Sequence, residues 1–415
     1  MKYGCIGEKL AHSYSKEIHS KIAPYEYELC EVSREGFAEF MERRDFIAIN
    51  VTIPYKRDVI PYLSYIDEGA EKIGAVNTIV NRGGKLCGYN TDFYGMSALI
   101  LRLGVDICGK KAAVLGTGGT SRTARAVLSS MGASEILTVS RTPHGEEIGY
   151  EELCSEHSDL DFIVNTTPCG MYPNPDGRLI DMACFSSLKG VVDAIYNPLR
   201  TNLILDAQER GIPASGGLYM LVAQAVRAAE IFMDKDLDTV AVTERIYAEM
   251  MAEKQDIVLI GMPGCGKSTV GRALSEKLGK EYLDLDEEIV RSDGREISRI
   301  FAEDGEAAFR DAETRVIRER ARFLTGAVIS TGGGAVLRTD NVRMLKQNGR
   351  IYFLNRDIEK IVPTKDRPLS SDADMLRKRF RERYGIYKSV CDREIITDEC
   401  VENTVRSIVE DFGKQ

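Results

Sequence analysis

A glycine-rich turn in the middle of the chain constrains the fold more than any other stretch. An apolar run, Ile257–Ile260, precedes Gly261-Met-Pro-Gly-Cys-Gly-Lys-Ser268, and a helical pattern begins at about Lys267. A strand, a G-x-x-x-x-G-K-S turn and a helix in this order form a phosphate-binding loop, because backbone N–H groups can surround a polyphosphate there. Lys267 would supply positive charge and Ser268 would hold Mg²⁺. The alternative, a glycine-rich turn with a chance lysine, does not explain why strand and helix flank the motif.

Length and composition indicate a soluble chain of more than one domain. The 415 residues allow two or three domains, and 43% hydrophobic with 29% charged residues is ordinary for a globular protein. No apolar run approaches the roughly 18 residues of a membrane span, and Met1 leads directly into strand-like sequence without a signal-peptide core. The whole net charge of −9 falls in residues 1–255, which argues against nucleic acid or a membrane as partner. Ten cysteines without metal-ligand spacing favour reduced thiols in the cytoplasm.

The first part of the chain alternates short strand-like runs with helical stretches, which predicts an α/β unit. The predicted strands are Tyr3–Ile6, Tyr25–Glu31, Phe46–Val51 and Thr78–Asn81. Polar groups follow or flank these strands: the hydroxyls of Ser13 and Ser15, then Thr52 and Lys56, then Asn77, and then Asp92. Each of these residues, considered alone, is more often part of a helix cap or a turn than of a catalytic site.

A second glycine-rich turn, Gly116-x-Gly118-Gly119, follows a strand that starts at Lys111 and opens a helix that reaches about Met131. This is a dinucleotide-type turn, although Ser121 takes the place of its third glycine. After the strand Ile136–Val139 comes Ser140-Arg141-Thr142, where an NAD site would carry Asp or Glu. A guanidinium at this position suits the 2′-phosphate of NADP, and a solvated arginine is the alternative. Strands at Phe162–Asn165 and Val191–Asp193 continue the doubly wound pattern.

Taken together, these residues resemble the shikimate dehydrogenase family over residues 1–250. The matching pieces, in order, are Ser13-x-Ser15, Asn50-Val-Thr-Ile-Pro-Tyr-Lys56, Gly74-Ala-Val-Asn-Thr78, Asn90-Thr-Asp92, the turn at Gly116–Gly119, Asp193-Ala-Ile-Tyr-Asn-Pro198 and Leu221-Val-Ala-Gln224. The resemblance implies a substrate-binding α/β domain at residues 1–95, completed by helices at 216–250. It also implies a Rossmann-like NADP-binding domain at residues 96–215.

The resemblance also implies roles for particular residues. Lys56 and Asp92 would be the catalytic pair, since hydride transfer to a ketone needs a proton donor for the developing oxygen charge. Substrate would be bound by Ser13, Ser15, Thr52, Asn77, Asp92, Tyr196 and Gln224, and NADP(H) by Gly116, Gly118, Gly119, Ser140, Arg141, Thr142 and Gly217. Two positions depart from the family pattern: Lys16 replaces a proline, and Pro143-His144 stands where a second basic residue often grips the 2′-phosphate.

Strands and helices alternate again after the phosphate-binding loop, with strands predicted at Glu281–Leu283, Ala327–Ser330 and Arg350–Leu354. The pair Asp284-x-Asp286 at a strand end suits one carboxylate near Mg²⁺ and one near a hydroxyl, or else a helix cap. Three glycines, Gly332–Gly334, close the next strand and permit close backbone approach to a ligand, or form a plain turn.

The second part of the chain resembles the shikimate kinase family over residues 256–415. The matching pieces are the phosphate-binding loop, Asp284-x-Asp286, Phe309-Arg310-x-x-Glu313, Gly332–Gly334, Arg367-Pro-Leu369 and Arg383-x-x-x-Tyr387. The resemblance implies a P-loop kinase domain with a parallel sheet. Shikimate would be held by Asp286, Arg310, Gly333 and Arg383; ATP by Gly264, Gly266, Lys267, Ser268 and Thr269; and Mg²⁺ by Ser268 and Asp284. Asp286 would receive or orient the hydroxyl proton, and Arg367 would be the cation of a lid.

The two resemblances imply consecutive reactions: reduction of 3-dehydroshikimate to shikimate with NADPH, then phosphorylation of shikimate with ATP. A quinate or NAD-using dehydrogenase joined to another small-molecule kinase is one alternative. A ligand-sensing regulator built on decayed enzymes is another, although Lys56, Asp92, Lys267 and Asp286 are intact. A homodimer is compatible with the sequence and not required by it. The charged stretch Arg245–Gln255 has no Gly, Ser or Pro spacer, which predicts a short, stiff connection between the halves.

Overall fold

A computed structural model describes residues 1–10, 13–361, 373–398 and 400–413. The chain divides into two compact units, Met1–Ala248 and Glu249–Gln415. Strands and helices alternate in both units, and the mixed α/β class predicted from the sequence is confirmed. The first unit contains a six-stranded and a five-stranded sheet, and the second unit contains a five-stranded sheet.

The first sheet has the strand order β2-β1-β3-β5-β6-β4. Strand β1 is parallel to both β2 and β3, whereas β5 runs antiparallel to its neighbours β3 and β6. The strands are β1 (Tyr3–Gly7), β2 (Tyr27–Glu31), β3 (Ala48–Val51), β4 (Tyr65–Ile66), β5 (Thr78–Arg82) and β6 (Lys85–Tyr89). The strands predicted around Tyr25 and Phe46 therefore start two residues later than expected, and β6 was not predicted.

Alternation of side chains along these strands supplies two apolar layers. Ile6, Ile49 and Ile79 pack with Phe37 and Met41 of α2 (Phe37–Arg43). On the opposite side, Cys5, Ala48 and Val80 pack with Ala228 and Phe232 of α8 (Leu218–Met233), which also contacts α1 (Ser15–Ile22). Helix α8, which lies near the end of the first unit in sequence, thus covers the sheet formed by the first residues of that unit.

The second sheet is parallel, with the order β11-β10-β9-β7-β8. Its strands are β7 (Lys111–Leu115), β8 (Glu135–Val139), β9 (Phe162–Asn165), β10 (Gly190–Asp193) and β11 (Ala214–Ser215). Residues of α4 (Asp92–Leu103) and α5 (Gly119–Ser130) pack on one face, and residues of α6 (Tyr150–Glu156) and α7 (Asn202–Glu209) on the other. The short helix α3 (Glu68–Ile73) lies between strands β4 and β5 in the sequence.

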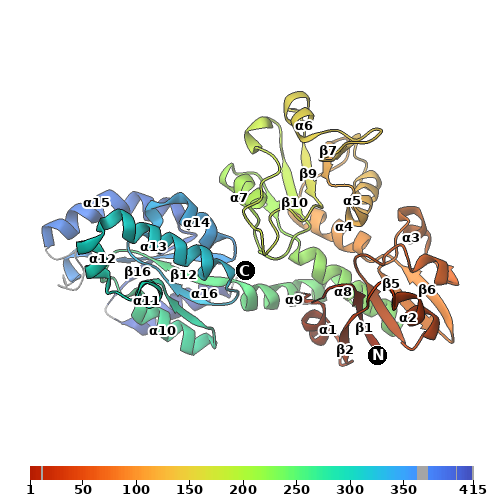
Figure 1. Cartoon of the computed structure of the whole chain (residues 1–415), viewed down its shortest axis with the longest axis horizontal. Helices are drawn as coiled ribbons and strands as arrows, with labels where there is room; N and C mark the ends of the chain where they lie inside the picture. The colour runs from red at the N-terminus through yellow and green to blue at the C-terminus, as the bar shows by residue number, and fades with distance from the viewer. Residues whose placement is uncertain (11–12, 362–372, 399, 414–415) are drawn as a thin grey trace. The chain divides into compact units, whose positions relative to one another are not determined.

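The third sheet forms the centre of the second unit, in the order β13-β14-β12-β15-β16 with every pairing parallel. Its strands are β12 (Asp256–Ile260), β13 (Tyr282–Asp284), β14 (Val328–Ser330), β15 (Gly349–Arg356) and β16 (Arg393–Thr397). Helices lie on both sides of this sheet (Figure 1). They are α10 (Lys267–Leu278), α11 (Leu285–Asp293), α12 (Ile297–Glu303), α13 (Gly305–Glu319), α14 (Thr339–Lys346), α15 (Ala373–Val390) and α16 (Val401–Phe412).

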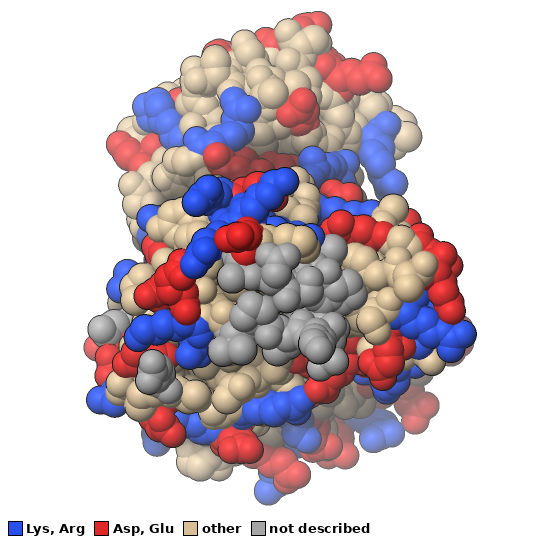
Figure 2. Space-filling view, turned by 90° about the vertical axis from the view of Figure 1, so that its left-hand side faces the viewer, with Lys and Arg blue, Asp and Glu red and all other residues tan. Residues whose placement is uncertain are grey.

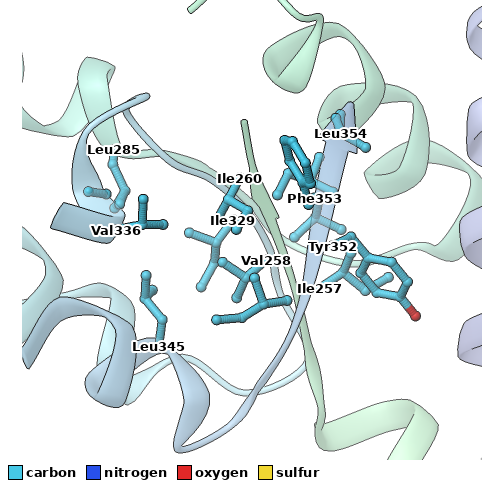
Figure 3. Packing of buried hydrophobic residues seen from close by; sticks show 14 of the residues in the cluster. Ile257, Val258, Ile260, Leu285, Ile329, Val336, Leu345, Tyr352, Phe353 and Leu354 are labelled. Carbon is cyan, nitrogen blue, oxygen red and sulfur yellow. The ribbon is translucent and has the colours of Figure 1, made fainter. Parts of the chain in front are cut away.

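The core of the third sheet is a continuous apolar layer. Ile257, Val258 and Ile260 of β12 pack among residues of β14 and β15, with Leu285 and Leu345 beside them (Figure 3). Strands buried on both faces read as unbroken apolar runs, which is why β12 was recognisable from sequence. Helix α9 (Thr239–Lys254) spans the point where one unit ends and the other begins, as expected for the charged stretch near Arg245. No described helix is both long and apolar enough to cross a membrane.

Helices α4 and α8 pack closely in the first unit, and a glycine permits this contact. A Cβ atom at Gly95 of α4 would lie 2.6 Å from the carbonyl oxygen of Met220 and 3.0 Å from the Cβ atom of Gln224 in α8. Since Asp92 begins α4 and Gln224 belongs to α8, this contact fixes the spacing of two predicted substrate residues.

Substitution Gly95→Ala tests this contact. The added methyl group must push α4 and α8 apart, and we expect the first unit to lose about 1–3 kcal/mol of unfolding free energy, as for other overpacked cores. Scanning calorimetry would show a lower unfolding temperature for the unit Met1–Ala248. Gly385→Ala is the control, because a Cβ atom there meets nothing within 4 Å and alanine favours the helix. Equal effects of both substitutions would contradict the close approach.

Candidate active sites

An ion pair between Lys56 and Asp92 marks the centre of the first candidate site. The Nζ atom of Lys56 donates a hydrogen bond to Oδ2 of Asp92 at 2.6 Å, and both side chains are mostly buried, with 17% and 11% exposed. Asp92 is held by the first turn of α4, while Lys56 follows the turn after β3, where the Tyr55 amide donates to the carbonyl of Thr52. Cys5 lies near this pair, and burial raises the pKa of its thiol to about 12.

Asn77 and Gln224 lie on the same side of the site and are joined through Thr91. Oδ1 of Asn77 accepts from the backbone N–H of Thr91 at 2.7 Å, and Nδ2 of Asn77 donates to Oγ1 of Thr91 at 3.1 Å. The Thr91 hydroxyl in turn donates to Oε1 of Gln224 at 3.3 Å. Thr91 immediately precedes Asp92, so these three predicted substrate residues share one network. Thr91 itself was not predicted.

The serine pair lies at the start of α1 and is close to a tyrosine from the other sheet. Oγ of Ser13 donates to Oγ of Ser15 at 3.0 Å, and no side chain caps the helix at Tyr14. The rings of Tyr14 and Tyr196 lie 5.2 Å apart between centroids, and burial raises the pKa of both phenols. The segment before α1 therefore meets the loop after β10, and Tyr196 packs on Tyr14, the residue between the two serines.

The glycine turn after β7 has the geometry that a dinucleotide requires. Gly116 has φ +106°, a backbone conformation that glycine adopts readily, and Gly118 is the N-cap residue of α5, with no side-chain cap on the helix N–H groups. These unsatisfied donors and the open space beside Gly118 and Gly119 fit a pyrophosphate at a helix N-terminus. Arg141 follows β8 and is exposed, between Ser140 and Thr142. Gly217 packs against the backbone of Ala194, next to the loop that carries Tyr196, and leaves no room there for a Cβ atom.

A buried polar chain supports this site from behind, and sequence reasoning missed it. The Tyr27 hydroxyl donates to Oδ1 of Asn50 at 2.6 Å, and Nδ2 of Asn50 donates to Oγ1 of Thr78 at 3.1 Å. The Thr78 hydroxyl donates to Oδ1 of Asn77 at 3.0 Å. Asn50 belongs to the motif that ends at Lys56. In the sequence, only its position on a strand between apolar residues could have indicated a buried polar role. The chain holds the amide of Asn77 in one orientation.

The second candidate site lies at the carboxyl ends of β12, β13 and β14. In the phosphate-binding loop, Nζ of Lys267 donates to the carbonyl oxygens of Gly261 and Met262, both at 3.0 Å. Ser268 donates to Oδ2 of Asp284 at 2.7 Å, while Oδ1 of Asp284 accepts from the backbone N–H of Asp286 and so caps α11. Asp284 thus serves as a helix cap and also faces Ser268. This hydroxyl–carboxylate pair fits Mg²⁺, which takes most of its ligands from phosphates and water.

The predicted substrate residues of this site line one cavity of about 1020 Å³ together with the phosphate-binding loop. Gly264, Gly266, Lys267, Ser268, Thr269, Asp286, Arg310, Gly333 and Arg383 are all among its lining residues. Nη1 of Arg310 donates to Oε2 of Glu313 at 2.8 Å, and Nη1 of Arg383 donates to the carbonyl of Gly333 at 3.1 Å. Burial raises the pKa of the Glu313 carboxyl, with Arg310 opposing that shift and the charge of Asp286 adding to it.

Two further residues of this site had no predicted role. Glu313 holds the guanidinium of Arg310, and the Tyr387 hydroxyl donates to the carbonyl of Gly333, the same oxygen that Arg383 contacts. Both residues belong to motifs identified in the sequence. The spacing of a motif does not show which group a side chain binds. Arg367, the predicted lid cation, lies outside the described residues.

Comparison with known proteins agrees with the first site. The family model described as shikimate dehydrogenase substrate binding domain matches residues 5–79. The shikimate dehydrogenase (NADP(+)) of Clostridium beijerinckii is 36% identical over 263 residues, covering 59% of this chain and 96% of the relative. The chain belongs to the shikimate dehydrogenase family.

Solved structures and a second family model extend this assignment. A shikimate dehydrogenase from Peptoclostridium difficile is 34% identical with a TM-score of 0.55, covering 60% of this chain and 97% of that one. A chorismate mutase/shikimate 5-dehydrogenase fusion from Clostridium acetobutylicum is 37% identical with a TM-score of 0.56, covering 59% and 94%. The shikimate kinase family model matches residues 263–412. This shikimate dehydrogenase is therefore fused to a shikimate kinase domain.

Substitution Tyr27→Phe tests the buried chain behind Asn77. Loss of the hydroxyl leaves a buried carbonyl oxygen of Asn50 without its donor, and we expect a loss of about 1–3 kcal/mol in unfolding free energy. The backbone N–H of Thr91 donates to Oδ1 of Asn77, and its hydrogen exchange should become faster.

Tyr25→Phe is the matched control, because the Tyr25 hydroxyl pairs with Nδ1 of His19 at 2.7 Å and not with Asn50. If hydrogen exchange at Thr91 accelerates equally in both variants, the hydrogen bond from Tyr27 to Asn50 does not hold Asn77 and Thr91 in place.

Proposed function

We propose that this bifunctional enzyme uses the two sites described above for consecutive steps: NADPH-dependent reduction of 3-dehydroshikimate to shikimate, and ATP-dependent phosphorylation of shikimate to shikimate 3-phosphate. The observation that carries the first step is the 2.6 Å contact between Lys56 and Asp92, within a network of hydroxyl and amide groups. The second step is supported by the cavity that joins the phosphate-binding loop to Asp286, Arg310 and Arg383.

In the reduction, the roles of the chain's residues follow from the charge that develops on the substrate. Bound NADPH supplies the hydride. Lys56 donates a proton to the carbonyl oxygen as that oxygen becomes a hydroxyl, and Asp92 holds the ammonium in position. Asn77 and Gln224, fixed through Thr91, offer amide groups to the substrate's hydroxyls, while Ser13, Ser15, Thr52 and Tyr196 would complete its binding site.

In the phosphorylation, positioning and charge dominate, because phosphoryl transfer needs little covalent participation from the protein. Bound ATP with Mg²⁺ supplies the phosphoryl group. Asp286 orients the substrate hydroxyl and accepts its proton, and the guanidinium groups of Arg310 and Arg383 bind the carboxylate. Lys267, buried among the carbonyls of its loop, would supply positive charge to the phosphates.

The domain assignment follows the three sheets. We assign substrate binding of the dehydrogenase to residues 1–95 with helices from 216–250, NADP(H) binding to 96–215, and kinase activity to 256–415. The partners are the small molecules themselves, and we assign the enzyme to the cytoplasm, where its ten free cysteines would stay reduced.

A coupled assay on the full chain tests the proposed function. 3-Dehydroshikimate, NADPH and ATP with Mg²⁺ should yield phosphorylated product, and quinate with NAD should be a poor combination. A higher kcat/KM for quinate with NAD than for shikimate with NADP would overturn the dehydrogenase assignment.

Single substitutions should separate the two activities. Lys56→Ala removes the proton donor, and we expect reduction to fall by about 10²–10⁴-fold while kinase turnover persists. Lys267→Ala should do the reverse, with a loss of about 10²-fold or more, because it removes a preorganised charge.

Lys72→Ala and Lys277→Ala are the controls, since both lysines are exposed and lie outside the two sites. Loss of both activities in either active-site variant would mean that the two halves depend on each other.

A further inference from the structure

Two of the arginines that line the kinase cavity, Arg356 and Arg379, have no role implied by the sequence patterns. Arg379 belongs to α15 and precedes Arg383 by one helical turn, so both side chains project from the same helix face. On the face of the molecule that Figure 2 shows, Lys and Arg are interspersed with Asp and Glu, so an exposed arginine alone would indicate nothing. Arg379 differs because its guanidinium lines the cavity.

The hydrogen-bond donors of Arg310, Arg383 and Arg379 are engaged to different extents. Arg310 donates through Nη1 to Glu313 at 2.8 Å and through Nη2 to Glu306 at 3.3 Å. Arg383 uses Nη1 for the carbonyl of Gly333. Nη1 of Arg379 is buried and has no hydrogen-bond partner within the described part of the chain, and the same holds for Nε of Arg310 and Nε of Arg356. A buried donor without an acceptor is costly, which indicates that an acceptor enters the cavity from outside.

The charges around Arg379 point to an anion. Burial lowers the pKa of Arg379, and the nearby charges of Arg383 and Arg310 lower it further, while Glu306 and Glu382 act in the opposite direction. Glu306 already accepts from Arg310, so it does not neutralise Arg379 separately. A bound carboxylate would relieve the repulsion among the three guanidinium groups and satisfy the free donor.

We propose that Arg379 is a specificity-determining residue of the kinase site, which donates to the carboxylate of shikimate beside Arg310 and Arg383. The inference rests on the proposed kinase function. The carboxylate is favoured over the transferred phosphoryl group because Arg379 adjoins the two arginines expected to bind the carboxylate.

Kinetics of Arg379→Gln in the full chain test this inference, with shikimate and its neutral carboxamide as substrates. Loss of a charge-assisted hydrogen bond should raise the KM for shikimate by about 10–100-fold. The KM for ATP should stay unchanged, which also reports an intact fold. With the carboxamide, wild type and variant should differ little. Arg379→Lys should recover part of the affinity.

Arg381→Gln is the matched control, because it removes the same charge from an exposed position on the same helix. An unchanged KM for shikimate, or an equal loss with acid and carboxamide, would overturn the inference. A raised KM for ATP would assign the guanidinium to the phosphates and overturn it as well. Failure of the wild type to phosphorylate shikimate would instead refute the proposed kinase function on which the inference rests.

Discussion

Both sites depend on one backbone event, a buried parallel strand that ends at a glycine and turns directly into a helix. Gly116 after β7 has φ +106° and Gly261 after β12 has φ +145°, conformations that other residues seldom adopt. In both places the turn exposes the first N–H groups of a helix at the carboxyl edge of a sheet. The helix termini can therefore bind phosphate groups, and the substrate residues have to come from neighbouring segments.

The neighbouring segments are supplied in different ways. In the first unit, β5 runs antiparallel and α8 returns from the end of the unit, so Asn77 and Gln224 come from segments far apart in sequence yet join through Thr91. In the second unit, the strands are all parallel; Asp284 ends β13, and Asp286 and Gly333 follow within three residues of the ends of β13 and β14. Arg383 reaches the same cavity from α15.

Sequence reasoning succeeded where a local pattern specifies a local shape. Strand β9 was predicted with its exact bounds, and the two phosphate turns were recognised because strand, glycines and helix are consecutive. It missed β6, which pairs with β5 across the two-residue turn Gly83-Gly84, and it missed β16, whose partner β15 is distant in sequence. It also failed for Asn50, Thr91 and Arg379, because burial and hydrogen-bond partners arise only when distant segments pack. The pairing of Lys56 with Asp92 was anticipated only through family resemblance.

The two sites differ in how they balance charge, and this bears on the compound they would share. In the first site the ammonium of Lys56 is matched by Asp92, and the remaining groups are neutral hydroxyls and amides. In the second, Arg310 is matched by Glu313 and Glu306, and the cavity is lined by further arginines and lysines together with the carboxylates of Asp286, Glu287 and Glu296. Charge-assisted hydrogen bonds are roughly twice as strong as neutral ones. A carboxylate therefore finds guanidinium donors in the second site, whereas the first site offers it mainly neutral hydroxyls and amides.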